Sequence, residues 1–169
     1  MATSNAHTTG APHAARREIV VTRLFDAPRA LVFRAWIDPQ HVARWWGPAG
    51  VTNPICEVDP RPGGAIRIDM RGADGSVSPM TGVFHDIVEP ERLVFTTSAF
   101  VDADGHPQLA VLNTATFADH DGKTMVTLRA VIVTSSPAVD APLAGMEEGW
   151  NQSLDRLAAC LGSVQGDKR

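Results

Sequence analysis

The order of hydrophobic and polar residues predicts a strand and then two short helices in the first part of the chain. Residues Glu18 to Phe25 are rich in Ile, Val and Thr, a composition typical of a strand. A helix start with proline in the first turn occurs at Asp26-Ala27-Pro28 and again at Asp38-Pro39, and apolar residues recur at helical spacing after each. The second of these helices is expected to end at Gly47-Pro48.

From Val51 to Val133 the chain alternates between strand-like runs and turn residues, which predicts a meander of antiparallel hairpins. Ile66, Ile68 and Met70 share one face of a strand, and charged side chains share the other, so this strand is expected to have one side in water. The later strands leave their inner face undecided. The expected turns are Arg61-Pro62-Gly63-Gly64, Gly72-Ala73-Asp74-Gly75, Glu89-Pro90-Glu91, Asp102 to Pro107 and Asp119 to Gly122.

After Ser135-Ser136-Pro137 the apolar residues recur every three or four positions through about Leu161, which predicts one long terminal helix. About 20 residues at 1.5 Å each make a rod roughly 30 Å long. A sheet with one apolar face must be covered, and no other predicted element is long enough to cover it. The fold class is therefore α+β, with a curved antiparallel sheet wrapped around a long C-terminal helix.

Length and composition fit one domain over residues 17–163, between a disordered tail over 1–16 and a flexible end over 164–169. The net charge of −4 argues against a nucleic-acid partner. No apolar run reaches the roughly 18 residues that a membrane span needs, and residues 1–15 lack the apolar segment of a signal peptide. A cytoplasmic location without membrane partners is therefore expected. Cys56 and Cys160 are expected to be free buried thiols.

Two adjacent tryptophans stand in the run Arg44-Trp45-Trp46-Gly47-Pro48. A helix turns by about 100° per residue, so the two rings cannot both point at one core. We expect Trp45 to seal the core. Trp46 is then expected at a rim, covered by the loop up to Pro54 or by a protein partner.

Gly145 and Gly149 interrupt the predicted terminal helix one turn apart, each at a cost of about 1 kcal/mol relative to alanine. One interpretation is close packing of the helix on the sheet. The other is a cavity between helix and sheet, walled by Trp150, Met146 and the strand face that carries Met70. The two interpretations do not exclude each other.

Several motifs together give a resemblance to the activator of heat-shock protein 90 ATPase homologue-like family, within the START-like (SRPBCC, polyketide cyclase) superfamily. The resemblance covers about residues 18–162 and implies a helix-grip fold, in which a curved sheet grips a C-terminal helix over a deep apolar cavity. Members of the superfamily are lipid carriers, cyclases, hormone receptors or co-chaperones. The motifs are Phe25-Asp26-Ala27-Pro28, Val32-Phe33-Arg34-Ala35-Trp36, Arg44-Trp45-Trp46-Gly47-Pro48, Asp59-Pro60-Arg61-Pro62-Gly63-Gly64, Met70-Arg71-Gly72-Ala73-Asp74-Gly75, Pro90-Glu91-Arg92-Leu93-Val94-Phe95-Thr96 and Gly145-Met146-Glu147-Glu148-Gly149-Trp150.

Candidate chemistry is sparse. His85 shares a strand face with Val83 and Ile87, and it is the best candidate for a titratable group on an apolar face, while Asn113 and Arg129 could polarise a ligand carbonyl. Asp102-Ala103-Asp104-Gly105 opens like a calcium loop, but the rest of the loop does not fit one, so a hairpin turn is expected and no metal or cofactor. The residues expected to contact a ligand are Trp36, Met70, Phe84, Phe95, Asn113, Met146 and Trp150.

Three functions remain open from the sequence. The first is binding of a small hydrophobic or aromatic ligand in the cavity. The second is a co-chaperone or other protein-interaction role, with a chaperone at the Trp46 rim. The third is an enzyme of the polyketide cyclase or dehydratase kind, which is less expected because convincing catalytic groups are few.

Overall fold

A seven-stranded antiparallel sheet forms the body of the molecule, in the order β1-β7-β6-β5-β4-β3-β2. The computed structural model describes residues 17–167, so the tail expected over 1–16 lies outside the described residues. Strands β2 to β6 are each followed by a turn that the sequence predicts. The strands are β1 (Glu18–Phe25), β2 (Thr52–Val58), β3 (Ala65–Arg71), β4 (Val77–Val88), β5 (Arg92–Val101), β6 (Pro107–His120) and β7 (Lys123–Thr134).

Strand register decides which side chains meet on the inner face of the sheet. Met70 lies opposite Ser78 on the β3–β4 pair, and Thr97 lies opposite Val111 on the β5–β6 pair. The sequence leaves the inner face of the later strands undecided. In β5 the inner face is the one that carries Leu93 and Phe95, both of which are buried. Residues of β3, β4, β5 and β6 therefore converge on one concave surface.

Two short helices, α2 (Arg29–Ile37) and α3 (Pro39–Trp45), follow β1 as predicted. The Asp38 carboxylate accepts a hydrogen bond from the Gln40 backbone N–H at 2.9 Å and so caps α3. The helix stops at Trp46, and Gly47 then adopts a φ of +93°, a left-handed conformation that favours glycine. This turn directs the chain into β2.

The terminal helical region is divided where the sequence predicts one continuous helix. A 3₁₀ turn (Pro137–Val139) and the short helix α4 (Asp140–Ala144) come first, Gly145 ends α4, and α5 (Met146–Asp167) begins after it. Gly145 breaks the helix because glycine is a poor helix former and a good C-cap residue. The C-terminal end of the helix also differs from the prediction, since α5 continues past Leu161 to Asp167.

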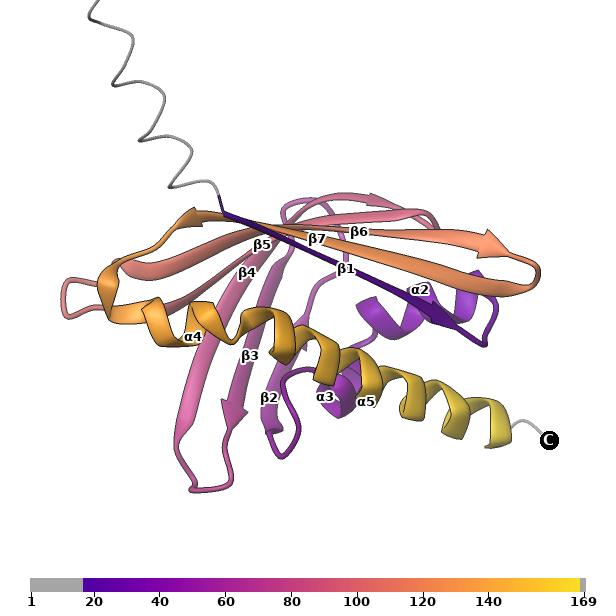
Figure 1. Ribbon diagram of the computed structural model, residues 1–169, viewed down its shortest axis with the longest axis horizontal. Helices are drawn as coiled ribbons and strands as arrows, with labels where there is room; N and C mark the ends of the chain where they lie inside the picture. Colours follow the sequence, from indigo (N-terminus) through magenta and orange to yellow (C-terminus); the bar gives the residue numbers. More distant parts are fainter. Residues whose placement is uncertain (1–16, 168–169) are drawn as a thin grey trace, which may run out of the picture.

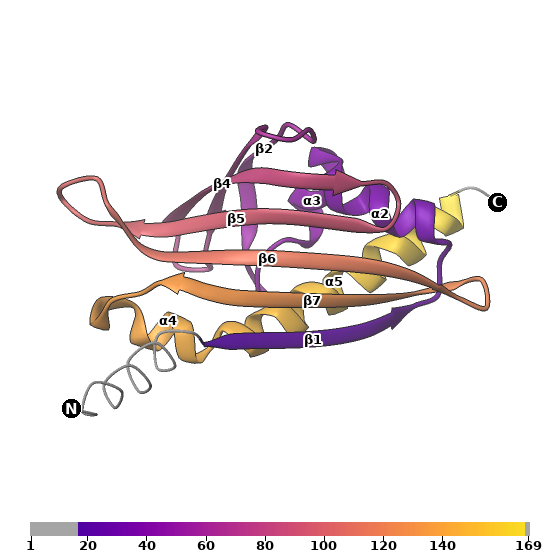
Figure 2. The same ribbon diagram turned by 90° about the horizontal axis from the view of Figure 1, so that it is seen from above.

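The sheet curves over α5, which crosses its concave side (Figure 1). Seen from above, strands β1, β7 and β6 lie over this helix, and α2 and α3 fill the end near the C-terminus (Figure 2). The α+β fold with two short helices after β1 and a long C-terminal helix packed on the sheet is confirmed.

Buried apolar residues form two separate clusters under the sheet. The larger cluster joins α2, α3 and the C-terminal part of α5, where Leu154 and Leu157 are completely buried. The smaller cluster gathers around Val139 and Leu143 beneath β6 and β7. Met146 packs on the smaller cluster and Trp150 on the larger one. The start of α5 therefore bridges two cores, and the space between them holds the candidate site.

Candidate functional site: a cavity between the sheet and the terminal helix

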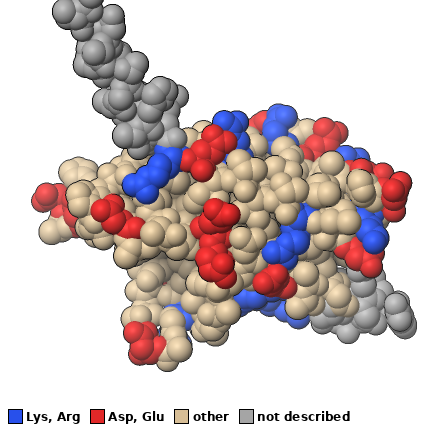
Figure 3. All heavy atoms as spheres, in the orientation of Figure 1, with Lys and Arg blue, Asp and Glu red and all other residues tan. Residues whose placement is uncertain are grey.

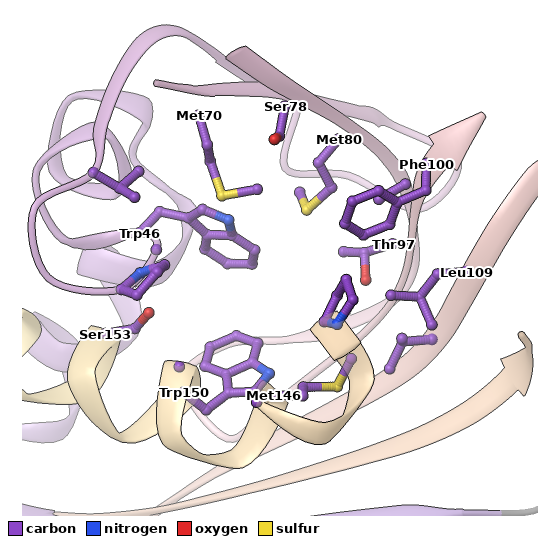
Figure 4. A pocket seen from close by; sticks show the side chains of 18 of the residues that line it. Trp46, Met70, Ser78, Met80, Thr97, Phe100, Leu109, Met146, Trp150 and Ser153 are labelled. Atoms are coloured by element: carbon purple, nitrogen blue, oxygen red, sulfur yellow. The ribbon is translucent and has the colours of Figure 1, made fainter. Parts of the chain in front are cut away.

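A cavity of about 370 Å³ opens between the concave face of the sheet and the start of α5. Figure 4 shows Met70, Met80 and Phe100 on one side of this space, with Met146 and Trp150 of α5 on the opposite side. A volume of this size is within the range of sites that bind small molecules. The structure thus favours the cavity over complete filling, and close packing is restricted to the deeper part of α5.

A row of small residues on the terminal helical region explains why the space is not filled. Gly149 and Ser153 lie one turn apart on the same face of α5, Gly145 precedes them by the same spacing at the end of α4, and all three line the cavity. A Cβ atom placed on Gly149 would have no atom of another part of the protein within 4 Å. Larger side chains resume at Leu154 and Leu157, where the helix reaches the main core.

All four tryptophans of the chain form one cluster at the inner end of the cavity. Trp150 stacks on Trp36 with ring centroids 6.0 Å apart and meets Trp46 edge-on at 5.3 Å. Trp45 packs between Trp36 and Trp46 and is completely buried, as expected, with its Nε1–H donating to the Ala35 carbonyl at 2.9 Å. Trp46 also lines the cavity, so its ring is covered largely from within the molecule.

Arg156 of α5 holds the turn that carries Trp46. Its guanidinium donates to the carbonyl oxygens of Arg44, Trp46, Gly47 and Pro48, at 3.0 to 3.1 Å. These groups include carbonyls left without a helical partner where α3 ends. Partial burial lowers the pKa of the Arg156 guanidinium. The cavity wall formed by residues 46–51 is thereby fixed to the same helix that forms the opposite wall.

The polar side-chain groups in the cavity are hydroxyls, one amide and the indole N–H groups of Trp46 and Trp150. Asn113 is buried, and its Nδ2 lies 3.2 Å from Thr97 Oγ1 and 3.3 Å from the carbonyl oxygens of Phe95 and Val111. The amide nitrogen is therefore fully used, whereas Asn113 Oδ1 accepts no hydrogen bond from the described residues. Ser153, on the opposite wall, adds a hydroxyl.

Four of the residues expected to contact a ligand lie together around this cavity: Met70, Asn113, Met146 and Trp150. The other three, Trp36, Phe84 and Phe95, are buried in the main core. They surround a void of only about 20 Å³ behind Trp46, which is too small for an organic ligand. Trp36 lies on α2, and the alternation along β4 and β5 does not show how deeply Phe84 and Phe95 are packed.

The two titratable candidates lie outside the cavity. The prediction that His85 shares a face with Val83 and Ile87 is wrong for Ile87, because a β-bulge between Phe84 and Asp86 shifts the register. Ile87 packs on the core, whereas the exposed His85 ring is hydrogen-bonded to the Thr96 hydroxyl. Arg129 is exposed on β7 and forms an ion pair with Glu18 of β1. Neither side chain can reach a ligand in the cavity.

Some cavity residues could not be assigned to a site from the sequence. Met80, Thr97, Phe100 and Leu109 come from strands whose inner face the alternation leaves open, and Ser78 lies on an edge of the cavity. Ser153 carries a usable signal, since it continues the four-residue spacing of Gly145 and Gly149. These residues complete the cavity wall.

Outside the cavity, the described residues include one group with metal-ligand atoms close together, Asp102, Asp104 and His106. All three are exposed, and the Asp102 carboxylate accepts hydrogen bonds from the backbone N–H groups of the other two. This is the hairpin turn that the sequence predicts. Cys56 and Cys160 are free thiols, and burial, assisted by the nearby charge of Glu57, raises the pKa of Cys56 to about 11.

The chain matches the family model described as activator of Hsp90 ATPase homolog 1-like protein over residues 26–162. No curated protein is significantly similar to it. Within residues 17–167, no helix is long and apolar enough to cross a membrane.

Solved structures of bacterial proteins share the fold. A protein of Nitrosomonas europaea is 23% identical, with a TM-score of 0.75 over 88% of this chain and 96% of the other. A protein of Chromobacterium violaceum is 28% identical, with a TM-score of 0.70 over 85% and 96% of the two chains. A Silicibacter pomeroyi protein that carries the family's name is 22% identical, with a TM-score of 0.73 over 88% and 99%.

Proposed function

The chain belongs to the activator of Hsp90 ATPase homolog 1-like family, and we propose that it binds a small hydrophobic or aromatic molecule in the cavity between the sheet and α5. One observation carries the proposal: about 370 Å³ of space lies between two well-packed cores. Empty apolar volume destabilises a fold, since the side chains around it lose packing contacts. A ligand would restore those contacts.

The lining of the cavity supports binding over catalysis. None of the side chains that line it is ionisable, so the cavity offers no group that could act as a general acid or base. His85 and Arg129, which could supply such chemistry, lie on the exposed side of the sheet. The Asn113 side-chain oxygen could accept a hydrogen bond from a ligand hydroxyl, a role that suits a binding site equally well.

A protein-interaction role at Trp46 has less support. The Trp46 ring contacts Trp45 and Trp150 and lines the cavity, so the molecule itself supplies much of the cover that a partner was expected to give. Asn53 also donates a hydrogen bond to the Trp46 carbonyl at 2.9 Å, which holds the start of β2 against this turn. Cavity binding explains the position of this ring more directly.

Native mass spectrometry of gently purified protein tests the proposal. The informative variant is Gly149→Leu, because a side chain at this position would enter open space in the cavity. Gly162→Leu is the matched control: it makes the same change on the same helix at an exposed position outside the cavity.

The proposal expects a noncovalent small-molecule adduct on the wild-type protein and on Gly162→Leu, and its loss from Gly149→Leu. When the proteins are mixed with a library of aromatic compounds and fatty acids, wild type and Gly162→Leu are expected to bind members of the library, and Gly149→Leu is not. A wild-type protein that always emerges empty and binds no member of the library would overturn the proposal. So would an adduct that persists unchanged in Gly149→Leu.

A further inference from the structure

We propose that the cavity selects uncharged aromatic molecules that carry an O–H or N–H donor, and that it rejects organic anions. This inference rests on the proposed binding function and specifies the class of ligand. Four features of the described residues support it: the absence of ionisable side chains in the lining, an acidic surround, aromatic and sulfur-containing walls, and an amide oxygen available as acceptor.

The lining offers nothing to neutralise a charged ligand. Its polar groups are Ser, Thr and Asn side chains and the indole N–H groups of Trp46 and Trp150, all of which present neutral dipoles. Two arginines on elements that line the cavity cannot serve. The Arg156 guanidinium is occupied by four carbonyl oxygens, and Arg71 is exposed and alternates with Met70 to the other face of β3. A carboxylate or sulfonate bound here would lose its hydration without gaining a counterion.

The elements around the cavity carry an excess of acidic side chains. Within residues 70–78, 97–108 and 140–153 there is one arginine and no lysine, against six carboxylates. Figure 3 shows acidic side chains over the β3–β4 turn, the β5–β6 turn and the start of α5. An anion approaching the cavity would therefore be repelled before it entered. The carboxylates are those of Asp74, Asp102, Asp104, Asp140, Glu147 and Glu148.

The walls are suited to a flat π-system. Trp46, Trp150 and Phe100 border the space together with the thioethers of Met70, Met80 and Met146 (Figure 4). Sulfur–aromatic contacts and ring–ring contacts are both favourable, and methionine adapts its shape to the ligand. Phe100 adopts a φ of +58°, a strained conformation for a bulky residue, and it borders the cavity while remaining partly exposed.

The hydrogen-bonding groups specify a donor on the ligand. Asn113 Nδ2 is directed at Phe95, Thr97 and Val111, and the side-chain oxygen of this cavity-lining residue has no hydrogen-bond donor among the described residues. A ligand O–H or N–H that reaches this oxygen makes a hydrogen bond that no described protein group supplies, and the ligand gains affinity from it. The Ser153 hydroxyl can add a second hydrogen bond from α5.

The test compares N-phenyl-1-naphthylamine with 1-anilinonaphthalene-8-sulfonate by fluorescence titration. Both probes share the same two ring systems and N–H group, and only the second carries an anionic sulfonate. The proposal predicts that the neutral probe binds the wild-type protein at least tenfold more tightly than the anionic one. The affinity for the neutral probe should fall at least tenfold in the Gly149→Leu variant and stay unchanged in the Gly162→Leu control.

A charge introduced at Ser78 separates electrostatic rejection from the greater hydrophobicity of the neutral probe. Ser78 is exposed at the edge of the cavity, so a longer side chain can be accommodated there without disturbing the core. Ser78→Lys should raise the affinity for the anionic probe at least tenfold and change that for the neutral probe less than threefold. The neutral Ser78→Gln variant should leave both affinities within threefold of wild type.

The outcomes distinguish this inference from the binding function on which it rests. If both probes bind with similar affinity and both are lost in Gly149→Leu, the cavity binds ligands but the charge selectivity is wrong. If Ser78→Lys leaves the ratio of affinities unchanged, the absence of a cation is not its cause, and the inference is overturned. If neither probe binds the folded wild-type protein, the proposed binding function fails with it.

Discussion

Removing the Arg156 guanidinium should loosen the connection between α5 and the turn that carries Trp46. Its Nη1 atom lies 3.0 Å from the carbonyl oxygens of Trp46 and Gly47 and 3.1 Å from that of Pro48, and its Nη2 atom lies 3.0 Å from that of Arg44. These charge-assisted hydrogen bonds join segments that are 108 to 112 residues apart in sequence.

The magnitude follows from how many of these hydrogen bonds can form at once. A hydrogen bond from a charged donor contributes about 1.5–3 kcal/mol, but Nη1 has two N–H groups for three acceptors. Water can also reach part of the exposed turn once the side chain is gone, which recovers some of the loss. Arg156→Ala is therefore expected to lower the free energy of unfolding by about 2–4 kcal/mol. Arg156→Lys should recover no more than about half of this, because a single ammonium cannot span acceptors on two sides.

Urea unfolding followed by both tryptophan fluorescence and circular dichroism measures these differences. Arg92→Ala is the matched control, since Arg92 forms an exposed ion pair with Asp86 at 2.7 Å and its loss should cost less than about 1 kcal/mol. The native tryptophan emission of Arg156→Ala should shift to longer wavelength as Trp46 becomes wetter. A loss no larger than that of the Arg92 variant, or full stability in Arg156→Lys, would refute the reasoning.

Three further predictions concern the core and the thiols. Trp45→Phe should lower the unfolding free energy by about 1–3 kcal/mol in the same urea assay, because it removes the buried hydrogen bond to Ala35 as well as ring volume; an unchanged midpoint would contradict this. Leu157→Ala should cost about 2–5 kcal/mol, since the side chain is completely buried beneath the sheet, and a cost below that of the Arg92 control would be inconsistent with such packing. In a Cys160→Ser background, iodoacetamide should label Cys56 slowly at neutral pH, because the raised pKa keeps the thiol protonated. The labelling rate should rise about tenfold for each pH unit up to about pH 11. A rate that levels off near pH 8.5 would show an ordinary thiol.

Local patterns predicted the strands and the two helices after β1 well, because residues close together in sequence specify these elements. The turns, the proline-led helix starts and the burial of Trp45 all follow from spacing and backbone preference. The glycine pair at 145 and 149 left close packing and a cavity both open, and in the structure both glycines line the cavity.

The limits of prediction arose where the outcome depends on contacts between distant segments. The bulge at His85 changes the face of Ile87, and alternation alone cannot reveal an inserted residue. The position of Phe84 and Phe95 in the core, away from the cavity, depends on how far the sheet curves toward α2 and α3. Arg156 carried no recognisable motif, because its partners are backbone carbonyls rather than a charged side chain.

The most direct test of ligand binding in the cavity is a titration with N-phenyl-1-naphthylamine, followed through the indole N–H signals of the four tryptophans in a ¹⁵N-labelled sample. Trp46 and Trp150 line the cavity, whereas Trp45 is completely buried and its indole N–H donates a hydrogen bond to the Ala35 carbonyl. Single Trp→Phe variants assign the signals. The account predicts saturable shifts for Trp46 and Trp150, with the Trp45 signal nearly unchanged. Four signals that all stay in place up to the solubility limit of the probe would contradict it.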